Sequence, residues 1–249
     1  MTPAQAPLLR LEHITKRFGG ITALKDVTFE VAPGQLVGLI GPNGSGKSTL
    51  FGVISGFHKP EQGRILFEGQ DITGRPPYVI ARLGVGRTFQ IVRPFPDLTA
   101  VENVKVGMLY GGGEARGRSG WQHAEELIEF VGLGRRAHVL AGQLTLADKK
   151  RLEIARALSI RPRLLLLDEV FAGLNPVEVQ QAIELIFRMR DTLGLTLIMV
   201  EHVLKALMET CERVIVLSYG EKIAEDTPGA VSVNPDVIRV YLGKAYADR

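Results

Sequence analysis

The sequence contains a single cysteine, Cys211, so the chain cannot form an internal disulfide bond. Residues 203–212 have the pattern of an amphipathic helix, and we expect Cys211 to be a small buried side chain there rather than a reactive thiol. Long apolar runs are also missing, since none approaches the roughly 18 residues of a membrane-spanning helix. The N-terminus shows no basic-then-apolar signal pattern. We therefore expect the chain to stay in the cytoplasm and to reach a membrane only through a partner.

Charge of one sign is not in excess either. Lys and Arg total 30 against 27 Asp and Glu, which gives a formal net charge of +3. The basic clusters, at residues 135–136 and 149–151, are too short to indicate a nucleic-acid partner. The sequence shows no internal repeat and no heptad pattern. Its length suits one domain, or one domain with a subdomain.

The most informative segment is residues 41–49, which read GPNGSGKST and fit the phosphate-binding pattern G-x-x-x-x-G-K-[ST]. An apolar run at residues 36–40 predicts a buried strand before it, and a helix is expected from Lys47 to about residue 56. Glycines allow the backbone N–H groups to form a concave nest for a polyphosphate, and the helix N-terminus adds partial positive charge. We expect Lys47 to reach the β- and γ-phosphates of a nucleotide and the Ser48 hydroxyl to ligate Mg²⁺. The predicted nucleotide-binding residues here are Gly41, Pro42, Asn43, Gly44, Ser45, Gly46, Lys47, Ser48 and Thr49.

A second pattern, RLLLLDE at residues 163–169, predicts a buried strand with two carboxylates at its C-terminal end. Ligands of parallel sheets bind at that edge. Asp168 would hold Mg²⁺ through water, and Glu169 would activate a water molecule against the γ-phosphate. The alternative is a pair of solvated turn acids, but the phosphate-binding pattern upstream favours the functional interpretation.

The order of expected elements indicates an α/β fold. Strands dominate the first part, helices the middle, and strands alternate with helices in the last part. This alternation predicts a parallel sheet covered on both faces, with the helical middle inserted into its connectivity. The expected strands are at residues 8–14, 27–31, 64–67, 164–167, 195–200 and 214–217, the expected helices at residues 78–83, 99–108, 122–131, 148–160, 175–193 and 203–212, and a flexible polar loop at residues 111–120.

On these motifs the sequence resembles the ATP-binding subunits of ABC transporters, over residues 8–242. GPNGSGKST corresponds to Walker A, and LLLLD followed by Glu169 to Walker B. The resemblance implies a P-loop NTPase with the ABC ATPase fold: a mostly parallel sheet core, an antiparallel β part and an inserted helical subdomain. It also implies a single ABC ATPase domain over residues 1–249, with a RecA-like core and β part at 1–90 and 161–249 and the helical subdomain at about 91–160.

The resemblance assigns further roles. Gln90, in RTFQ, corresponds to the residue that senses Mg²⁺ and the attacking water, and His202 to the γ-phosphate contact. Phe18 is at the place of an aromatic residue that stacks on adenine, with a core position as the alternative. The implied catalytic residues are Glu169, His202, Gln90 and Lys47, and the implied Mg²⁺ ligands are Ser48, Gln90 and Asp168.

The segment LTLAD at residues 144–148 stands where the family has its signature, usually LSGGQ. Thr145 keeps a hydroxyl and Ala147 an accessible N–H, so both are expected to contact the nucleotide bound by the opposite subunit. The cations at residues 149–151 crowd the first turn of a helix, where they oppose the helix dipole. Either a docked anion offsets that cost, or these side chains point to water.

Other segments resemble the ATPases of branched-chain amino acid importers, in particular AGLNP at residues 172–176, GRTFQ at residues 86–90 and the tail segments at residues 216–225 and 240–243. The implied function is ATP binding and hydrolysis, with Mg²⁺, in an importer of branched-chain or related amino acids. Implied partners are a second ATPase subunit, in a heterodimer or a homodimer, permease subunits contacted at residues 90–98, and indirectly a substrate-binding protein. The implied location is peripheral, on the cytoplasmic side of the inner membrane. Alternatives are an exporter ATPase of the lipopolysaccharide type, a soluble non-transport ABC ATPase and a weakly hydrolysing regulatory subunit.

Overall fold

The computed structural model describes residues 6–110 and 117–242. Its centre is a six-stranded sheet in the order β10-β9-β3-β8-β7-β6, parallel except for β10, which runs antiparallel to β9. Every residue of β3, β7 and β8 is buried, as expected for a parallel sheet covered on both faces. The strands are β3 (Leu36–Ile40), β6 (Val85–Arg87), β7 (Leu164–Asp168), β8 (Thr196–Val200), β9 (Arg213–Ser218) and β10 (Glu221–Asp226).

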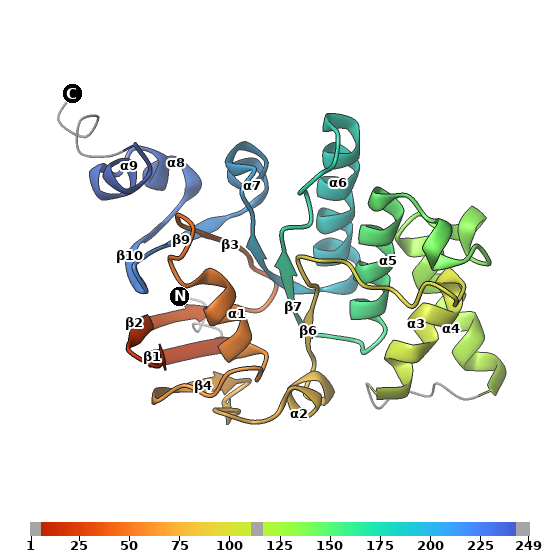
Figure 1. The fold of residues 1–249 in the computed structure, drawn as a ribbon, viewed down its shortest axis with the longest axis horizontal. Helices are drawn as coiled ribbons and strands as arrows, with labels where there is room; N and C mark the ends of the chain where they lie inside the picture. The colour runs from red at the N-terminus through yellow and green to blue at the C-terminus, as the bar shows by residue number, and fades with distance from the viewer. Residues whose placement is uncertain (1–5, 111–116, 243–249) are drawn as a thin grey trace.

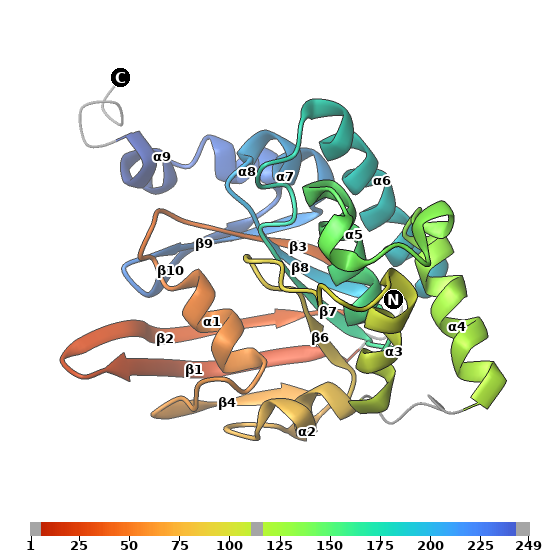
Figure 2. The ribbon, with the colours of Figure 1, turned by 45° about the vertical axis from the view of Figure 1, so that its right-hand side comes forward.

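A second sheet has four antiparallel strands in the order β2-β1-β4-β5. Its strands are β1 (Leu9–Phe18), β2 (Ile21–Val31), β4 (Gln62–Phe67) and β5 (Gln70–Asp71). Helix α1 (Lys47–Ile54) lies between the two sheets (Figures 1 and 2). Phe51 of α1 shares one core with Leu11 of β1 and Leu166 of β7, so α1 joins the sheets through apolar contacts.

The other face of the six-stranded sheet is covered by helices. Leu158, Ile186 and Leu207, from three different helices, share a second core with Leu165 and Leu197 of the sheet. These helices are α5 (Leu146–Leu158), α6 (Pro176–Leu193) and α7 (Leu204–Thr210). The remaining helices are α2 (Pro77–Arg82), α3 (Ala100–Tyr110), α4 (Gly117–Phe130), α8 (Pro228–Ser232) and α9 (Pro235–Leu242), with 3₁₀ turns η1 (Gly134–Arg136) and η2 (Ala141–Gln143).

Helices α3 and α4 lie beside α5 at one end of the molecule, away from the antiparallel sheet (Figure 1). Helix α3, expected from residue 99, begins with a capping box: the Thr99 N–H donates to Glu102 Oε2 at 2.8 Å, and the Glu102 N–H donates to Thr99 Oγ1 at 3.3 Å. Helix α6, expected from residue 175, begins with a capping box of Asn175 and Glu178. The division of the chain at residues 90 and 160 stays a prediction.

Two local predictions were wrong. The polar loop expected through residue 120 ends earlier, because α4 already begins at Gly117. Residues 111–116 of that loop lie outside the described residues. Contacts with α3 stabilise the first turns of α4. Gly120 is buried, and the Lys105 ammonium of α3 lies 3.3 Å from the centre of the Trp121 ring. Tertiary packing thus overrides the weak helix propensity of glycine.

The second wrong detail concerns Cys211, which is buried as predicted but follows α7 instead of lying within it. Burial raises the pKa of its thiol, which agrees with an unreactive side chain. Over residues 6–110 and 117–242, no helix combines the length and the apolar character that crossing a membrane requires.

Candidate active site

The loop between β3 and α1 has a backbone that only glycine can follow at two positions. Gly41 and Gly46 have φ angles of 152° and 107°. A Cβ atom at Gly46 would lie 2.6 Å from the carbonyl oxygen of Ala23, and one at Gly41 would collide with the carbonyl oxygen of Leu217. The loop is therefore fitted closely between β2 and β9, and α1 starts directly behind it at Lys47.

The Lys47 side chain is buried inside this loop. Its ammonium donates to the carbonyl oxygens of Gly41 at 2.7 Å and Pro42 at 3.0 Å. Burial lowers the pKa of Lys47, while the nearby Glu169 and Asp168 carboxylates raise it. Neutral oxygens hold the ammonium, so its positive charge remains available to an anionic ligand of the loop.

A cleft of about 710 Å³ opens at this loop. Its lining brings together residues that are far apart in the sequence: the loop and the start of α1, the segment after β6, the end of β7 and the end of β8. The predicted residues among them are Asn43, Gly44, Ser45, Gly46, Lys47, Ser48, Thr49, Gln90, Glu169 and His202. Sequence reasoning missed four others, Ile21, Thr22, Ala23 and Tyr219, because no local pattern indicates that the start of β2 and the turn after β9 lie next to the loop.

Three of the predicted catalytic residues meet at one carboxylate. Glu169 Oε2 accepts a hydrogen bond from Gln90 Nε2 at 2.8 Å, and Glu169 Oε1 lies 2.9 Å from His202 Nε2. The Glu169 backbone is in the left-handed region, with φ of 51°, directly after β7. A non-glycine residue in that region is a feature of functional sites when its surroundings fix it.

The surroundings of Glu169 do fix it. Its N–H donates to the Val200 carbonyl at 2.9 Å, and its own carbonyl accepts from Lys150 Nζ at 2.7 Å. Lys150 is buried, which lowers the pKa of its amine. Of the basic cluster at residues 149–151, Lys150 thus does not point to water, and that alternative is wrong for it.

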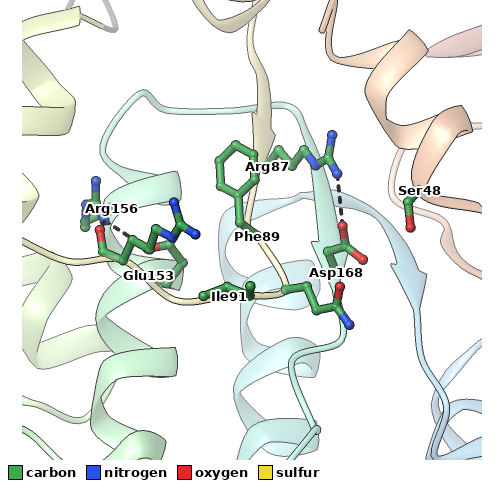
Figure 3. Close-up of a pocket in the computed structure, with 9 residues that line it drawn as sticks. Ser48, Arg87, Phe89, Ile91, Glu153, Arg156 and Asp168 are labelled. Atoms are coloured by element: carbon green, nitrogen blue, oxygen red, sulfur yellow. Dashed lines mark hydrogen bonds and ion pairs between the residues drawn. The ribbon is translucent and has the colours of Figure 1, made fainter. Parts of the chain in front are cut away.

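Asp168, one residue earlier, is buried at the end of β7. Burial raises the pKa of its carboxyl group, and the Arg87 guanidinium opposes the shift. A second cavity of about 530 Å³ is lined by Asp168, Ser48 and Gln90, the three predicted Mg²⁺ ligands, among others. Figure 3 shows Asp168 with Arg87 on one side and Ser48 on the other.

The side chains of Ser48, Gln90 and Asp168 suit Mg²⁺ as it is bound in nucleotide-binding sites. A hydroxyl, an amide and a carboxylate offer the hard oxygen atoms that this ion prefers. The described parts of the chain contain no group of three or more His, Cys, Asp or Glu residues that could hold a metal ion alone. Mg²⁺ at this place would therefore depend on phosphate oxygens and water for its remaining ligands.

Six predicted residues do not line the cleft: Gly41 and Pro42 of the loop, Asp168, which lines the second cavity, and Phe18, Thr145 and Ala147. Phe18 packs edge-on against His58, with 5.1 Å between ring centres, and is 44% exposed, so the core alternative for it is wrong. Thr145 is the N-cap of α5, and its hydroxyl donates to Asp148 Oδ2 at 2.7 Å. Ala147 lies in the first turn of that helix. The signature segment therefore does not contribute to the cleft of its own chain.

The comparisons with known proteins agree with this geometry. The family model described as "ABC transporter" matches residues 24–172, and the model described as "Branched-chain amino acid ATP-binding cassette transporter" matches residues 221–247. The chain belongs to the ABC transporter family. Two relatives of this ABC ATPase are the high-affinity branched-chain amino acid transport ATP-binding proteins LivG of Escherichia coli K12 and BraF of Pseudomonas aeruginosa. Each is 40% identical to it over 96% of this chain and 99% of the relative.

Solved structures show the same fold. The ATP-binding cassette of an ABC transporter in its ADP conformation matches with a TM-score of 0.89 and 32% identity, over 96% of this chain and 100% of that one. A cassette described as dimeric, in a post-hydrolysis state bound to ADP and Pi, matches with a TM-score of 0.79 and 28% identity, over 88% of this chain and 98% of that one. The predicted ABC ATPase fold, with a mostly parallel core sheet and an antiparallel β part, is confirmed.

Proposed function

We propose that this ABC ATPase is the ATP-hydrolysing subunit of an importer for branched-chain or related amino acids. The observation that carries the hydrolytic part is the Glu169 carboxylate, held between Gln90 and His202 at the cleft of a phosphate-binding loop. The names of the relatives support the cargo. They do not favour the exporter or the soluble non-transport ATPase.

Each residue of the site has a separate role in the proposed hydrolysis. Backbone N–H groups of residues 43–49 and the Lys47 ammonium bind the phosphates. Glu169 accepts the proton of the attacking water, and His202 contacts the γ-phosphate and keeps the Glu169 carboxylate in place. Ser48, Gln90 and Asp168 would hold Mg²⁺, which when bound would neutralise charge on the phosphates. Phe18 stacks on adenine.

The proposed active unit is a dimer. Thr145 and Ala147 do not line the cleft of their own chain, and a related cassette is described as dimeric with ADP and Pi. Each signature would contact the nucleotide in the opposite subunit, so ATP would favour the closed dimer because only that state lets it touch both halves. The replacement of glycine by Leu146 and of glutamine by Asp148 supports a heterodimer with a second ATPase subunit.

The permease is proposed to dock at residues 90–98. Ile91 and Arg93 line the cavity that also contains Asp168 and Gln90, so a permease segment there would lie next to the residues that act on ATP. The chain would sit peripherally on the cytoplasmic side of the inner membrane. A substrate-binding protein would act on the other side without touching this subunit.

ATP hydrolysis tests the proposal. The purified chain is assayed with Mg²⁺ and ATP alone, then mixed with candidate ATPase and permease subunits. Activity that needs a second ATPase supports the heterodimer, and strong activity from the chain alone supports a homodimer. Nucleotide binding without hydrolysis in every mixture would overturn the catalytic proposal in favour of a regulatory subunit.

A further inference from the structure

Arg87 is a nearly buried cation with a role that the family motifs do not assign. It ends β6, and its Nη2 donates to Asp168 Oδ2 at 3.0 Å. Its Nη1 donates to the Ser55 hydroxyl, at the end of α1, at 3.2 Å. The guanidinium therefore connects three elements of the nucleotide site: the strand before Gln90, the end of β7 and the helix behind the phosphate-binding loop.

Three aromatic rings surround the same guanidinium. Its central carbon lies 5.6 Å from the ring centre of Phe51, 5.8 Å from that of Phe57 and 5.1 Å from that of Phe89. Phe51 is buried in the core, whereas Phe57 and Phe89 are 52% and 42% exposed. These two exposed rings, the aromatic pair, meet edge to face at 5.8 Å. They also line one cavity of about 300 Å³ together with Arg87.

The position of Arg87 fixes how Asp168 can act. One carboxylate oxygen, Oδ2, is taken by the guanidinium, and Ser48 lies on the opposite side of the carboxylate (Figure 3). The guanidinium is planar, and three neighbouring rings restrict its movement, so its N–H groups keep their direction toward Asp168 and Ser55. Asp168 is thereby kept with its other oxygen available for a ligand.

We propose that Arg87 is a positioning residue that links the exposed aromatic pair of Phe57 and Phe89 to the Mg²⁺ carboxylate of Asp168. The inference rests on the proposed function, since Mg²⁺ with ATP is the ligand concerned. The aromatic pair holds the guanidinium in place, and the guanidinium sets the orientation of Asp168.

The first test measures Mg²⁺, not turnover. A fluorescent ATP analogue is titrated onto the purified chain in EDTA and at a series of Mg²⁺ concentrations. In Arg87→Met, the Mg²⁺ concentration for half-maximal tight binding is expected to rise about tenfold, because the charge-assisted bond to Asp168 is lost. Affinity in EDTA is expected to stay within about twofold, since the phosphate-binding loop is intact. An unchanged Mg²⁺ requirement, or an equal loss with and without Mg²⁺, would overturn the proposal.

Arg190→Met is the matched control. Arg190 also pairs with carboxylates, those of Asp191 and Glu212. Its guanidinium lies 5.1 Å from the ring centre of Phe187. Arg190 belongs to α6, however, and lines none of the three cavities described above. Its loss should leave the Mg²⁺ requirement as in wild type. If Arg87→Met does not fold, Arg87→Lys replaces it: the charge remains without the planar fork, and a rise of about threefold is expected.

Phe57→Ala tests the link to the surface. Removing one ring of the aromatic pair leaves Arg87 less fixed, so the Mg²⁺ requirement should rise about threefold. In the Arg87→Met background the same substitution should have no further effect. A Phe57→Ala shift of equal size in both backgrounds would overturn the link through Arg87. Failure of the proposed function would look different, because the wild-type chain would then hydrolyse no ATP in any mixture, whether or not Mg²⁺ binding depends on Arg87.

Discussion

At the scale of single residues, the phosphate-binding loop depends on glycines that have no room for a side chain. Gly46 combines a φ of 107° with a close approach to the Ala23 carbonyl oxygen. This position caps α1, so its backbone decides where the first N–H groups of the helix point. A Cβ at this point would move both the loop and the helix start.

Gly46→Ala is therefore expected to destabilise the fold by about 2 kcal/mol and to weaken nucleotide binding more than tenfold. Urea unfolding and a fluorescent nucleotide titration measure the two effects. Gly229→Ala in α8 is the control: a Cβ there meets nothing within 4 Å, so neither quantity should fall. Equal behaviour of the two variants would show that Gly46 is not under this constraint.

Sequence reasoning reached most of the candidate site because its residues lie in contiguous motifs. The loop at residues 41–49, Asp168 and Glu169 follow strands in patterns with a known physical purpose. Arg87 was missed as an Asp168 partner because 81 positions separate the two, and no local pattern states that β6 lies next to β7. Tyr219 was missed for the same reason, since it faces the loop only through the turn after β9.

At the scale of elements, α5 is tied to the Walker B turn through Lys150. The lysine lies in the helix that begins with the signature segment, and its ammonium reaches the Glu169 carbonyl. The same ammonium faces the buried Glu201 carboxyl. A movement of α5 would therefore be transmitted to the backbone of the proposed catalytic base.

Lys150→Met should lower kcat about tenfold while nucleotide affinity stays within about twofold, because the loop at residues 41–49 is untouched and Glu169 loses its backbone restraint. Steady-state kinetics and nucleotide titration separate these quantities. Lys150→Arg should restore much of kcat, and the exposed Lys205→Met on α7 should change nothing. A parallel loss of kcat and affinity would indicate general damage to the fold instead.

The end of β8 carries a buried acid. Glu201 accepts a hydrogen bond from the Phe171 N–H at 2.9 Å, and burial raises its pKa from 4.5 to about 7. Between these values the folded chain holds a proton that the unfolded chain has released. Unfolding therefore releases a proton in this range, and the free energy of unfolding must fall as pH rises from about 4.5 to 7.

The titration of Glu201 alone should lower the free energy of unfolding by about 2 kcal/mol between pH 5.5 and pH 7.5. Glu201→Gln keeps the acceptor for Phe171 but cannot titrate, so the difference between urea-unfolding free energies at these two pH values should shrink by about that amount. Glu209→Gln, an exposed change on α7, should keep the wild-type difference. If Glu201→Gln kept it as well, Glu201 would not titrate in this range.

The elements that the sequence predicted best are those with local signals. The capping boxes at Thr99 and Asn175 marked helix starts to the residue. The start of α4 could not be found in this way, since its first turns are stabilised by contacts with α3 that no local pattern encodes. Strands β1 and β2 also run longer than predicted, because they pair with each other beyond their apolar stretches, up to Phe18 and Ile21.

At the scale of the whole molecule, part of the signature segment is exposed but does not line the cleft of its own chain. Leu146 there is 50% exposed beside the N-cap Thr145. In the proposed dimer this surface meets the γ-phosphate side of the partner's nucleotide. The segment would then be needed for association but not for binding of the first nucleotide.

Leu146→Glu should abolish ATP-dependent dimerisation, because the added carboxylate repels the phosphates across the interface. ATP affinity of the single chain should stay within about twofold, since its own cleft is unchanged. Light scattering with and without ATP, in the mixture that supports hydrolysis, measures association. Leu193→Glu, at the exposed end of α6, should associate normally. Persistent dimerisation of Leu146→Glu would place the interface elsewhere.

Glu169→Gln removes the proposed catalytic base. The variant and the wild-type chain are incubated with Mg²⁺ and ATP in a mixture that supports hydrolysis, and the bound nucleotide is recovered and identified. The variant is expected to retain ATP while its turnover falls at least about a hundredfold, because glutamine can still bond Gln90 or His202 but cannot accept the proton of water. Wild-type protein should yield ADP. Near wild-type turnover in the variant would contradict the assignment of Glu169 as the catalytic base, and with it the proposed mechanism.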